Sequence, residues 1–137
     1  MYQVFEHTAD LGLRIEADSF EELFVEAGRA LFSVLVRNLD EVRPLESRRL
    51  TVPRDEPAYW LADWLRELLY VFDTHRWLFS RFEVRLDESQ LEALCWGEPI
   101  DRTRHYLDHE VKAITYHGLV CRQRDDGRWE AEVIVDI

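Results

Sequence analysis

A run of apolar residues in the middle of the chain limits the possible folds more than any other stretch does. Pro57 stands where a helix accepts proline in its first turn. Apolar residues then recur at spacings of three and four, the period of one helix face; they are Tyr59, Trp60, Leu61, Trp64, Leu65, Leu68, Leu69 and Phe72. A helix this apolar has to bury most of its circumference, so we expect it to pack on a sheet.

A second helix is predicted nearer the N-terminus. Asp18 and Ser19 can cap it, Glu21 and Glu22 favour its first turn, and an apolar stripe runs from Phe20 to about Val36. Alternating apolar and polar residues, bounded by turn residues, predict strands over 2–7, 11–17, 45–52, 77–86, 90–96, 111–122 and 129–135. Residues 97–108 read as a polar loop. We therefore expect one α+β domain over residues 1–137, with mixed or antiparallel sheets and two long helices packed on them.

The predicted strand from Val111 to Gly118 is unusual because both of its faces are mixed. Lys112 shares its face with Ile114 and Tyr116, and His117 lies on the other face. A lysine in such surroundings has to bury its ammonium at a cost, reach water, or meet carboxylates. The ordinary alternative is an edge strand with a solvated lysine and a surface histidine.

The charge balance limits the partners. The formal net charge is −11, from 28 acidic and 17 basic residues, so the average surface repels a phosphate backbone and we expect no stable nucleic-acid binding. A basic protein or a cation would be attracted, although acidity also serves solubility. Cys95 and Cys121 lie far apart without metal-ligand spacing, which favours reduced, buried thiols. No stretch resembles a signal peptide or a membrane span, so we expect no membrane association and a cytoplasmic location.

Two aspartates stand at conspicuous places. Asp10 follows His7 and Thr8 in the first predicted turn, where a side chain that caps its own turn is the simpler interpretation. Asp136 and Ile137 end an apolar strand with no tail. Two carboxylates with the Ile137 carbonyl would make a hard-cation site, suited to calcium, magnesium or manganese rather than zinc.

The histidines and the familiar motifs point to no common enzyme class. His75 follows the second helix, where it complements the helix dipole. His105 and His109 are four residues apart, a metal-pair spacing only on a helix, which this polar segment does not predict. His117 has the strongest functional case because it shares a predicted strand with Lys112. The sequence contains no zinc-protease, hydrolase-elbow, phosphate-loop or dinucleotide motif.

Five motifs, in register from the first turn to the last residue, resemble the archease family. They are His7-Thr8-Ala9-Asp10-Leu11-Gly12, Trp64-Leu65 with Glu67-Leu68-Leu69-Tyr70 and Phe72-Asp73, Gly97-Glu98-Pro99 with Asp101 and His105, Lys112-Ala113-Ile114-Thr115-Tyr116-His117-Gly118, and Val135-Asp136-Ile137. Arg66 and Ile100 depart from the family pattern, which has a smaller polar residue and an aromatic residue there.

The resemblance implies an archease-like fold and an accessory role rather than a stand-alone enzyme. Archeases activate the RtcB-type RNA-splicing ligase by promoting guanylylation of the ligase histidine and multiple turnover, so GTP is expected to act through the ligase. The resemblance places the metal ligands at Asp10, Asp136 and Ile137, and the functionally important lysine at Lys112. His7 and His117 are neighbours of that expected site.

Two other functions stay open at this stage. One is a chaperone-like binding module for an RNA-methylating partner, a role also proposed for this family. The other is a metal-dependent hydrolase with its own turnover, which lacks a recognisable arrangement of nucleophile and base.

Overall fold

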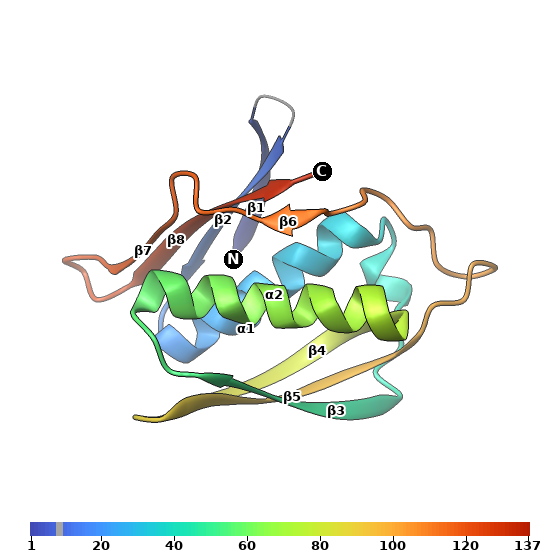
Figure 1. Ribbon diagram of the computed structural model, residues 1–137, viewed down its shortest axis with the longest axis horizontal. Coiled ribbons are helices and arrows are strands. Elements are labelled where there is room, and N and C mark those ends of the chain that lie inside the picture. Colours follow the sequence, from blue (N-terminus) through green and yellow to red (C-terminus); the bar gives the residue numbers. More distant parts are fainter. Residues whose placement is uncertain (8–9) are drawn as a thin grey trace.

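The computed structural model describes residues 1–7 and 10–137. The described chain is an α+β domain with two α-helices, a short 3-10 helix and two antiparallel sheets, as predicted (Figure 1). The elements are β1 (Tyr2–His7), β2 (Asp10–Ala17), α1 (Phe20–Leu35), η1 (Leu39–Glu41), β3 (Glu46–Pro53), α2 (Pro57–His75), β4 (Trp77–Leu86), β5 (Gln90–Pro99), β6 (Ala113–Ile114), β7 (Val120–Gln123) and β8 (Trp129–Asp136).

The two helices form a layer between the two sheets. The larger sheet has the order β1-β2-β8-β6, with β7 also paired to β8, and the smaller has the order β3-β5-β4. α1 contacts β2 of the larger sheet and β4 of the smaller one, and α2 contacts β3 and β7 (Figure 1). Neither helix of the described chain has the length and apolarity of a membrane span.

Local signals place both helices where the sequence predicts them. The Ser19 hydroxyl oxygen accepts the Glu22 N–H at 3.1 Å and so caps α1. Pro57 occupies the first turn of α2. Trp64 is fully buried, and its indole N–H donates to the Phe24 carbonyl at 2.9 Å, which fixes α2 against α1.

The predicted strand over 111–122 is wrong in one respect, because the structure divides it into β6 and β7. Both strands pair with β8. Between them the Thr115 N–H and hydroxyl both donate to the Ile134 carbonyl, at 3.0 and 2.9 Å. The Leu119 N–H then reaches the Tyr116 carbonyl at 3.3 Å, and Gly118 adopts a φ of +58°, a backbone conformation that glycine tolerates. His117 therefore lies in a turn rather than on one strand with Lys112.

The predicted loop over 97–108 begins too early, since β5 continues to Pro99. Gly97 lies so close to the Leu78 carbonyl oxygen that any side chain would collide with the backbone. In the sequence, the alternation of apolar and polar residues stops after Trp96, because this close approach requires a residue without a side chain at position 97.

Cys95 is buried and Cys121 is half-buried, and both are free thiols. Burial raises the pKa of Cys95 and raises that of Cys121 to about 12, so both thiols are protonated at neutral pH. No disulfide involves either cysteine in the described chain, which agrees with the expected free thiols, and the expected burial is complete only for Cys95.

A buried carboxylate holds the long segment that follows β5. Both Glu98 and His105 are almost inaccessible. Glu98 accepts the Arg43 N–H at 2.7 Å, lies 3.1 Å from His105 Nε2 and pairs with Arg104. The Asp101 N–H donates to His105 Nδ1 at 2.9 Å, so Nε2 carries the proton that Glu98 accepts. Burial by itself raises the pKa of Glu98, but hydrogen bonds from Arg43, His105 and Arg104 outweigh it and hold that pKa below its usual value.

We predict that Glu98→Gln lowers the free energy of unfolding by about 2 to 4 kcal/mol, because an amide cannot accept from all three donors. The folded-state pKa of Glu98 lies below the unfolded value, so the ionised carboxylate stabilises the fold above the ordinary glutamate pKa. That stabilisation is lost as the pH falls through the folded pKa. Urea unfolding at neutral pH and at about pH 3.5 measures both effects, and the deficit should shrink at the lower pH. Glu88→Gln, in the exposed turn between β4 and β5, is the matched control; an equal loss in both variants would contradict the assignment.

Candidate functional site

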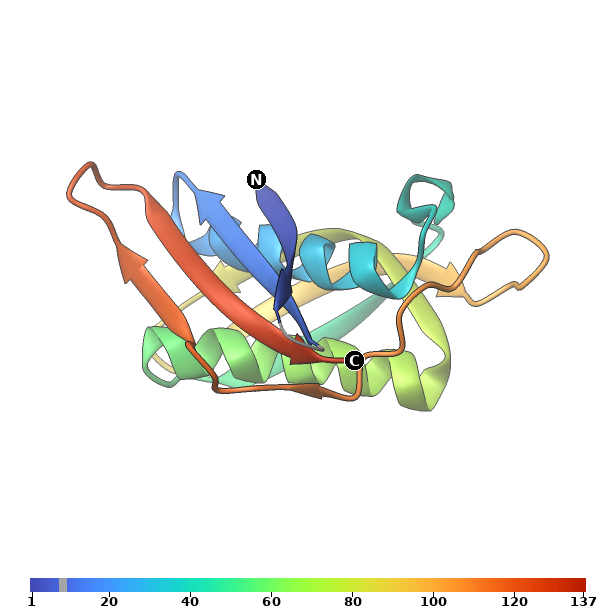
Figure 2. The same cartoon turned by 90° about the horizontal axis from the view of Figure 1, so that it is seen from above.

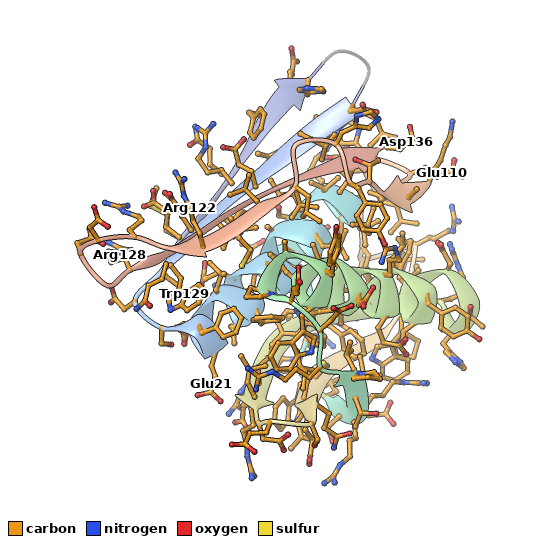
Figure 3. All side chains as sticks on the ribbon, turned by 60° about the vertical axis from the view of Figure 1, so that its left-hand side comes forward. Glu21, Glu110, Arg122, Arg128, Trp129 and Asp136 are labelled. Atoms are coloured by element: carbon orange, nitrogen blue, oxygen red, sulfur yellow. The ribbon has the colours of Figure 1, made fainter. Side chains whose placement is uncertain are left out.

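Two aspartates face each other at one end of the larger sheet. Asp10 opens β2 and Asp136 closes β8, and the antiparallel register makes them direct partners. Alternation along both strands buries the odd-numbered residues, so the two aspartates lie on the face that points away from the helices. His7 continues the row on one side and Ala113 on the other. Figure 3 shows Asp136 at this end of the sheet.

The aspartate pair differs from the other acidic pair of the same two strands. Glu16 faces Glu130 in the same register, but Arg124 lies 3.6 Å from Glu16 and Arg122 lies 2.8 Å from Glu130. Each of those carboxylates therefore has its own guanidinium. Like charges directly opposite each other destabilise a sheet unless a cation compensates them.

Asp10 and Asp136 have no such arginine. Among residues 1–7 and 10–137, the only basic group within 4 Å of either carboxylate is His7, whose Nδ1 lies 3.9 Å from Asp10 Oδ2. The Asp10 side chain is only 25% exposed, which limits screening by water. The sheet end thus holds an excess of negative charge that a bound cation would relieve.

The chemistry of the donors fits a hard cation. Both side chains present carboxylate oxygens, which favour calcium, magnesium or manganese. No cluster of three or more His, Cys, Asp or Glu side chains suited to a metal occurs in the described part of the chain. A cation here therefore needs main-chain oxygens too, and Ile137 can supply them because its side chain packs against the core and holds the chain end at the sheet.

Lys112 lies beside Asp136 along the backbone but serves another surface. The Lys112 N–H donates to the Asp136 carbonyl at 2.7 Å, and Figure 2 shows the C-terminal end of β8 next to the segment leading into β6. Lys112 lines the groove between β6 and α2, whereas the two carboxylates belong to the outer face of the sheet. Within the described residues no carboxylate lies within 4 Å of its ammonium. Lys112 is also the only lysine of the chain.

Of the two histidines expected beside the site, the structure places His7 next to the aspartates but does not place His117 there. His7 is brought to the aspartates by its pairing with Asp10. His117 lies in the turn after β6, where its N–H donates to the Thr115 hydroxyl at 3.3 Å, and its side chain is exposed. The turn residues Thr8 and Ala9 lie outside the described residues. Asp10 itself belongs to β2 and not to the turn, contrary to the predicted start of that strand at Leu11.

Several residues near the groove were given no functional role on the basis of the sequence. Asp73, on α2, has a raised pKa because burial disfavours its charge; Arg76 opposes this shift and Glu110 adds to it. The Arg66 guanidinium lies over the Tyr116 ring, 4.6 Å from its centre. The exposed face of α2 could have indicated these residues, but only the fold places residues 110–116 against it.

Comparison with known proteins identifies the relatives of this chain. The profile of the Archease protein family (MTH1598/TM1083) matches residues 2–137. The chain belongs to the archease family. It is 38% identical to the archease of Pyrococcus abyssi, over 99% of this chain and 98% of that protein. It is 39% identical to the archease of Methanopyrus kandleri, over 99% of each chain.

Solved archease structures have the same fold. The solution structure of Methanobacterium thermoautotrophicum protein 1598 is 34% identical and superposes with a TM-score of 0.85, covering 99% of this chain and 98% of that one. A crystal structure of a Thermotoga maritima archease, titled a possible chaperone, is 23% identical with a TM-score of 0.66, covering 100% and 98%. The family resemblance of the sequence motifs is therefore confirmed, and the second structure supports the fold alone.

We predict that Asp10→Asn stabilises the protein when a chelator is present, by about 0.2 to 1 kcal/mol, because it removes repulsion between directly opposite carboxylates. Urea unfolding in EDTA measures the change. Glu16→Gln is the control, since it removes a carboxylate that Arg124 already compensates, and it should give no gain. A loss of stability in Asp10→Asn would show that the pair is compensated within the protein.

Proposed function

We propose that this archease activates an RtcB-type RNA-splicing ligase by promoting guanylylation of the ligase histidine and multiple turnover in tRNA splicing and RNA repair. The observation that carries the proposal is the uncompensated Asp10 and Asp136 pair, joined through the Asp136 carbonyl to the backbone of Lys112. An archease chain with this arrangement can present two cationic groups, a bound divalent ion and the Lys112 ammonium, to a ligand rich in phosphate.

Asp10, Asp136 and the Ile137 main-chain oxygen are the residues that would hold a divalent cation, either Ca²⁺, Mg²⁺ or Mn²⁺. When bound, the cation supplies positive charge that stabilises phosphate oxygens. The chain itself contributes orientation, because the paired strands hold both carboxylates on one face. His7 stands beside Asp10 and closes one side of the row.

Lys112 is proposed to contact the nucleotide or a ligase carboxylate. Its ammonium is exposed and is not neutralised by any carboxylate within 4 Å among the described residues. A free ammonium just before β6 can bind phosphate as a point charge. In this proposal GTP stays bound to the ligase, and the archease acts as an activator without turnover of its own.

The overall charge supports a protein partner rather than RNA. A net charge of −11 opposes stable binding to a phosphate backbone and favours a basic protein surface. The same charge also fits a chaperone-like module for an RNA-methylating partner, which would benefit that partner through binding alone.

Incubation with GTP and RNA ends, with and without the ligase, separates these functions from a hydrolase. Acceleration only with the ligase supports the activator, and turnover without the ligase supports the hydrolase.

We predict that Mg²⁺, Mn²⁺ or Ca²⁺ raises the melting temperature, since an ion that binds only the folded state stabilises it by mass action. Asp136→Asn should abolish most of the increase, because it removes one of two charged ligands. Differential scanning calorimetry across a metal titration measures the increment. Glu130→Gln, on the same face of β8 and paired with Arg122, should keep it; an unchanged increment in Asp136→Asn would place the ion elsewhere.

We predict that Lys112→Ala keeps the fold and the affinity for the ligase but loses most of the acceleration of guanylylation. Truncating an exposed side chain costs little stability, whereas a charge aimed at phosphate cannot be replaced by a methyl group. Lys112→Arg keeps the charge and should retain part of the effect. Guanylylation rates at saturating archease measure the loss, and full acceleration by Lys112→Ala would remove the lysine from the proposed mechanism.

A further inference from the structure

A groove separates α2 from β6 on the side of the molecule that carries Lys112. Its volume is about 640 Å³, which is enough for one or two side chains of a partner. Figure 1 shows α2 between β6 of the larger sheet and β3 of the smaller one. The lining residues from α2 are Asp63, Arg66, Glu67, Leu69, Tyr70 and Asp73.

Aromatic rings line and flank the groove. Tyr70 is 58% exposed on α2 and lines it directly. At the neighbouring turn Tyr116 packs edge-on against Tyr59, with ring centres 5.8 Å apart, and Arg66 covers the same Tyr116 ring. Tyrosine and arginine are enriched among the residues that anchor protein interfaces. Tyrosine offers a large, rigid contact area, and arginine offers a planar group that stacks on rings and donates several hydrogen bonds. The patch therefore has the composition of a binding surface.

The charges of the groove indicate the sign of its occupant. Asp63 is already paired with Arg66 at 2.7 Å. Among the described residues, no basic group lies within 4 Å of Glu67 or Asp73. Glu110, which lies near Asp136 in Figure 3, adds negative potential at Asp73, and Arg76 opposes it. The Lys112 ammonium also lines the groove, but neither Glu67 nor Asp73 has an ion-pair partner within 4 Å among the described residues, so a cation that reaches them gains from both carboxylates.

We propose that the groove between α2 and β6 binds an arginine-bearing segment of a protein partner, with the guanidinium on the Tyr70 ring and between Glu67 and Asp73. A guanidinium fits best because it stacks on aromatic faces and pairs with carboxylates in one plane. A nucleic acid is disfavoured since its phosphates would meet the same carboxylates. The inference rests on the proposed function only for the identity of the partner, which is then the ligase.

Occupation of the groove places the partner beside Lys112 and Asp136. Lys112 lines the same groove, and its N–H is bonded to the carbonyl of Asp136. A segment docked on α2 therefore holds its protein against the edge of β6, with the aspartate row just beyond. In this proposal the groove contributes affinity and orientation, and the cation site at Asp10 and Asp136 contributes the positive charge that contacts phosphate.

The first test uses nona-arginine as the probe and does not depend on the ligase. In amide NMR titrations of the isotope-labelled protein, shifts should concentrate on residues 63–73 and 112–116, and salt should weaken them. Two groove variants, Tyr70→Ala and the double variant Glu67→Gln with Asp73→Asn, should weaken binding by about tenfold. The matched controls are Tyr106→Ala, whose tyrosine is 61% exposed against 58% for Tyr70, and Glu88→Gln. Circular dichroism confirms that each variant folds.

Three outcomes of that titration overturn the proposal: no binding by the wild-type protein, equal binding by groove and control variants, or shifts centred on another surface of the protein. Loss of binding in the groove variants alone supports it. Tyr70→Phe keeps the ring, so retained affinity in this variant identifies stacking as the interaction.

The second test decides whether the ligase carries the segment. The groove variants should raise the Kd for the ligase by about tenfold, yet reach wild-type acceleration of guanylylation at saturating concentration. Lys112→Ala should show the opposite pattern, with normal Kd and lost acceleration. Suppose that wild-type archease binds and accelerates the ligase and that the groove variants bind the ligase with the wild-type Kd. The proposed function then stands, and the ligase is not the partner that occupies the groove. If the wild-type protein fails to bind the ligase, the proposed function fails and the peptide titration alone decides the groove.

Discussion

The register of β8 against β2 is the constraint on which the candidate site depends. Ala131, Val133 and Val135 bury their side chains against the helix layer, and this burial fixes which residues of β8 face inward. A slip of one residue would turn those side chains towards solvent and bring Asp136 into the core. The hydrophobic core therefore holds two carboxylates face to face on the outer surface, although like charges at such positions repel each other.

Burial of the helices between two sheets explains why that repulsion is tolerated. The indole of Trp64 ties α2 to the backbone of α1, and the indole of Trp60 donates to the Val52 carbonyl of β3 at 3.2 Å. Burying two such side chains stabilises the fold by several kcal/mol, on the order of 3 to 5 for each truncation to alanine. A like-charge pair that costs less than about 1 kcal/mol can persist on this scaffold. The scaffold supports an electrostatically unfavourable site that a ligand would relieve.

In the proposed function, the groove along α2 and the pair of Asp10 and Asp136 have different roles and lie on different surfaces of the protein. Residues on α2 provide contact area and free carboxylates, whereas the sheet end provides oxygen ligands. Lys112 joins them, because its backbone bonds to Asp136 while the residue lines the groove. In this proposal, substitutions at Tyr70 or Glu67 alter affinity without disturbing the residues proposed to face phosphate.

The sequence by itself determined the elements whose signals are local. Spacing of apolar residues and capping by Ser19 located both helices, and alternation located most strands, because these patterns follow from the geometry of one segment. Oxygen chemistry also singled out Asp10 and Asp136 as a candidate pair. Only the tertiary structure decided the rest: the division of 111–122 into two strands, the burial of His105 beside Glu98, and the groove that Lys112 shares with α2. Each of these depends on contacts between residues distant in the chain, so no local period or propensity records them.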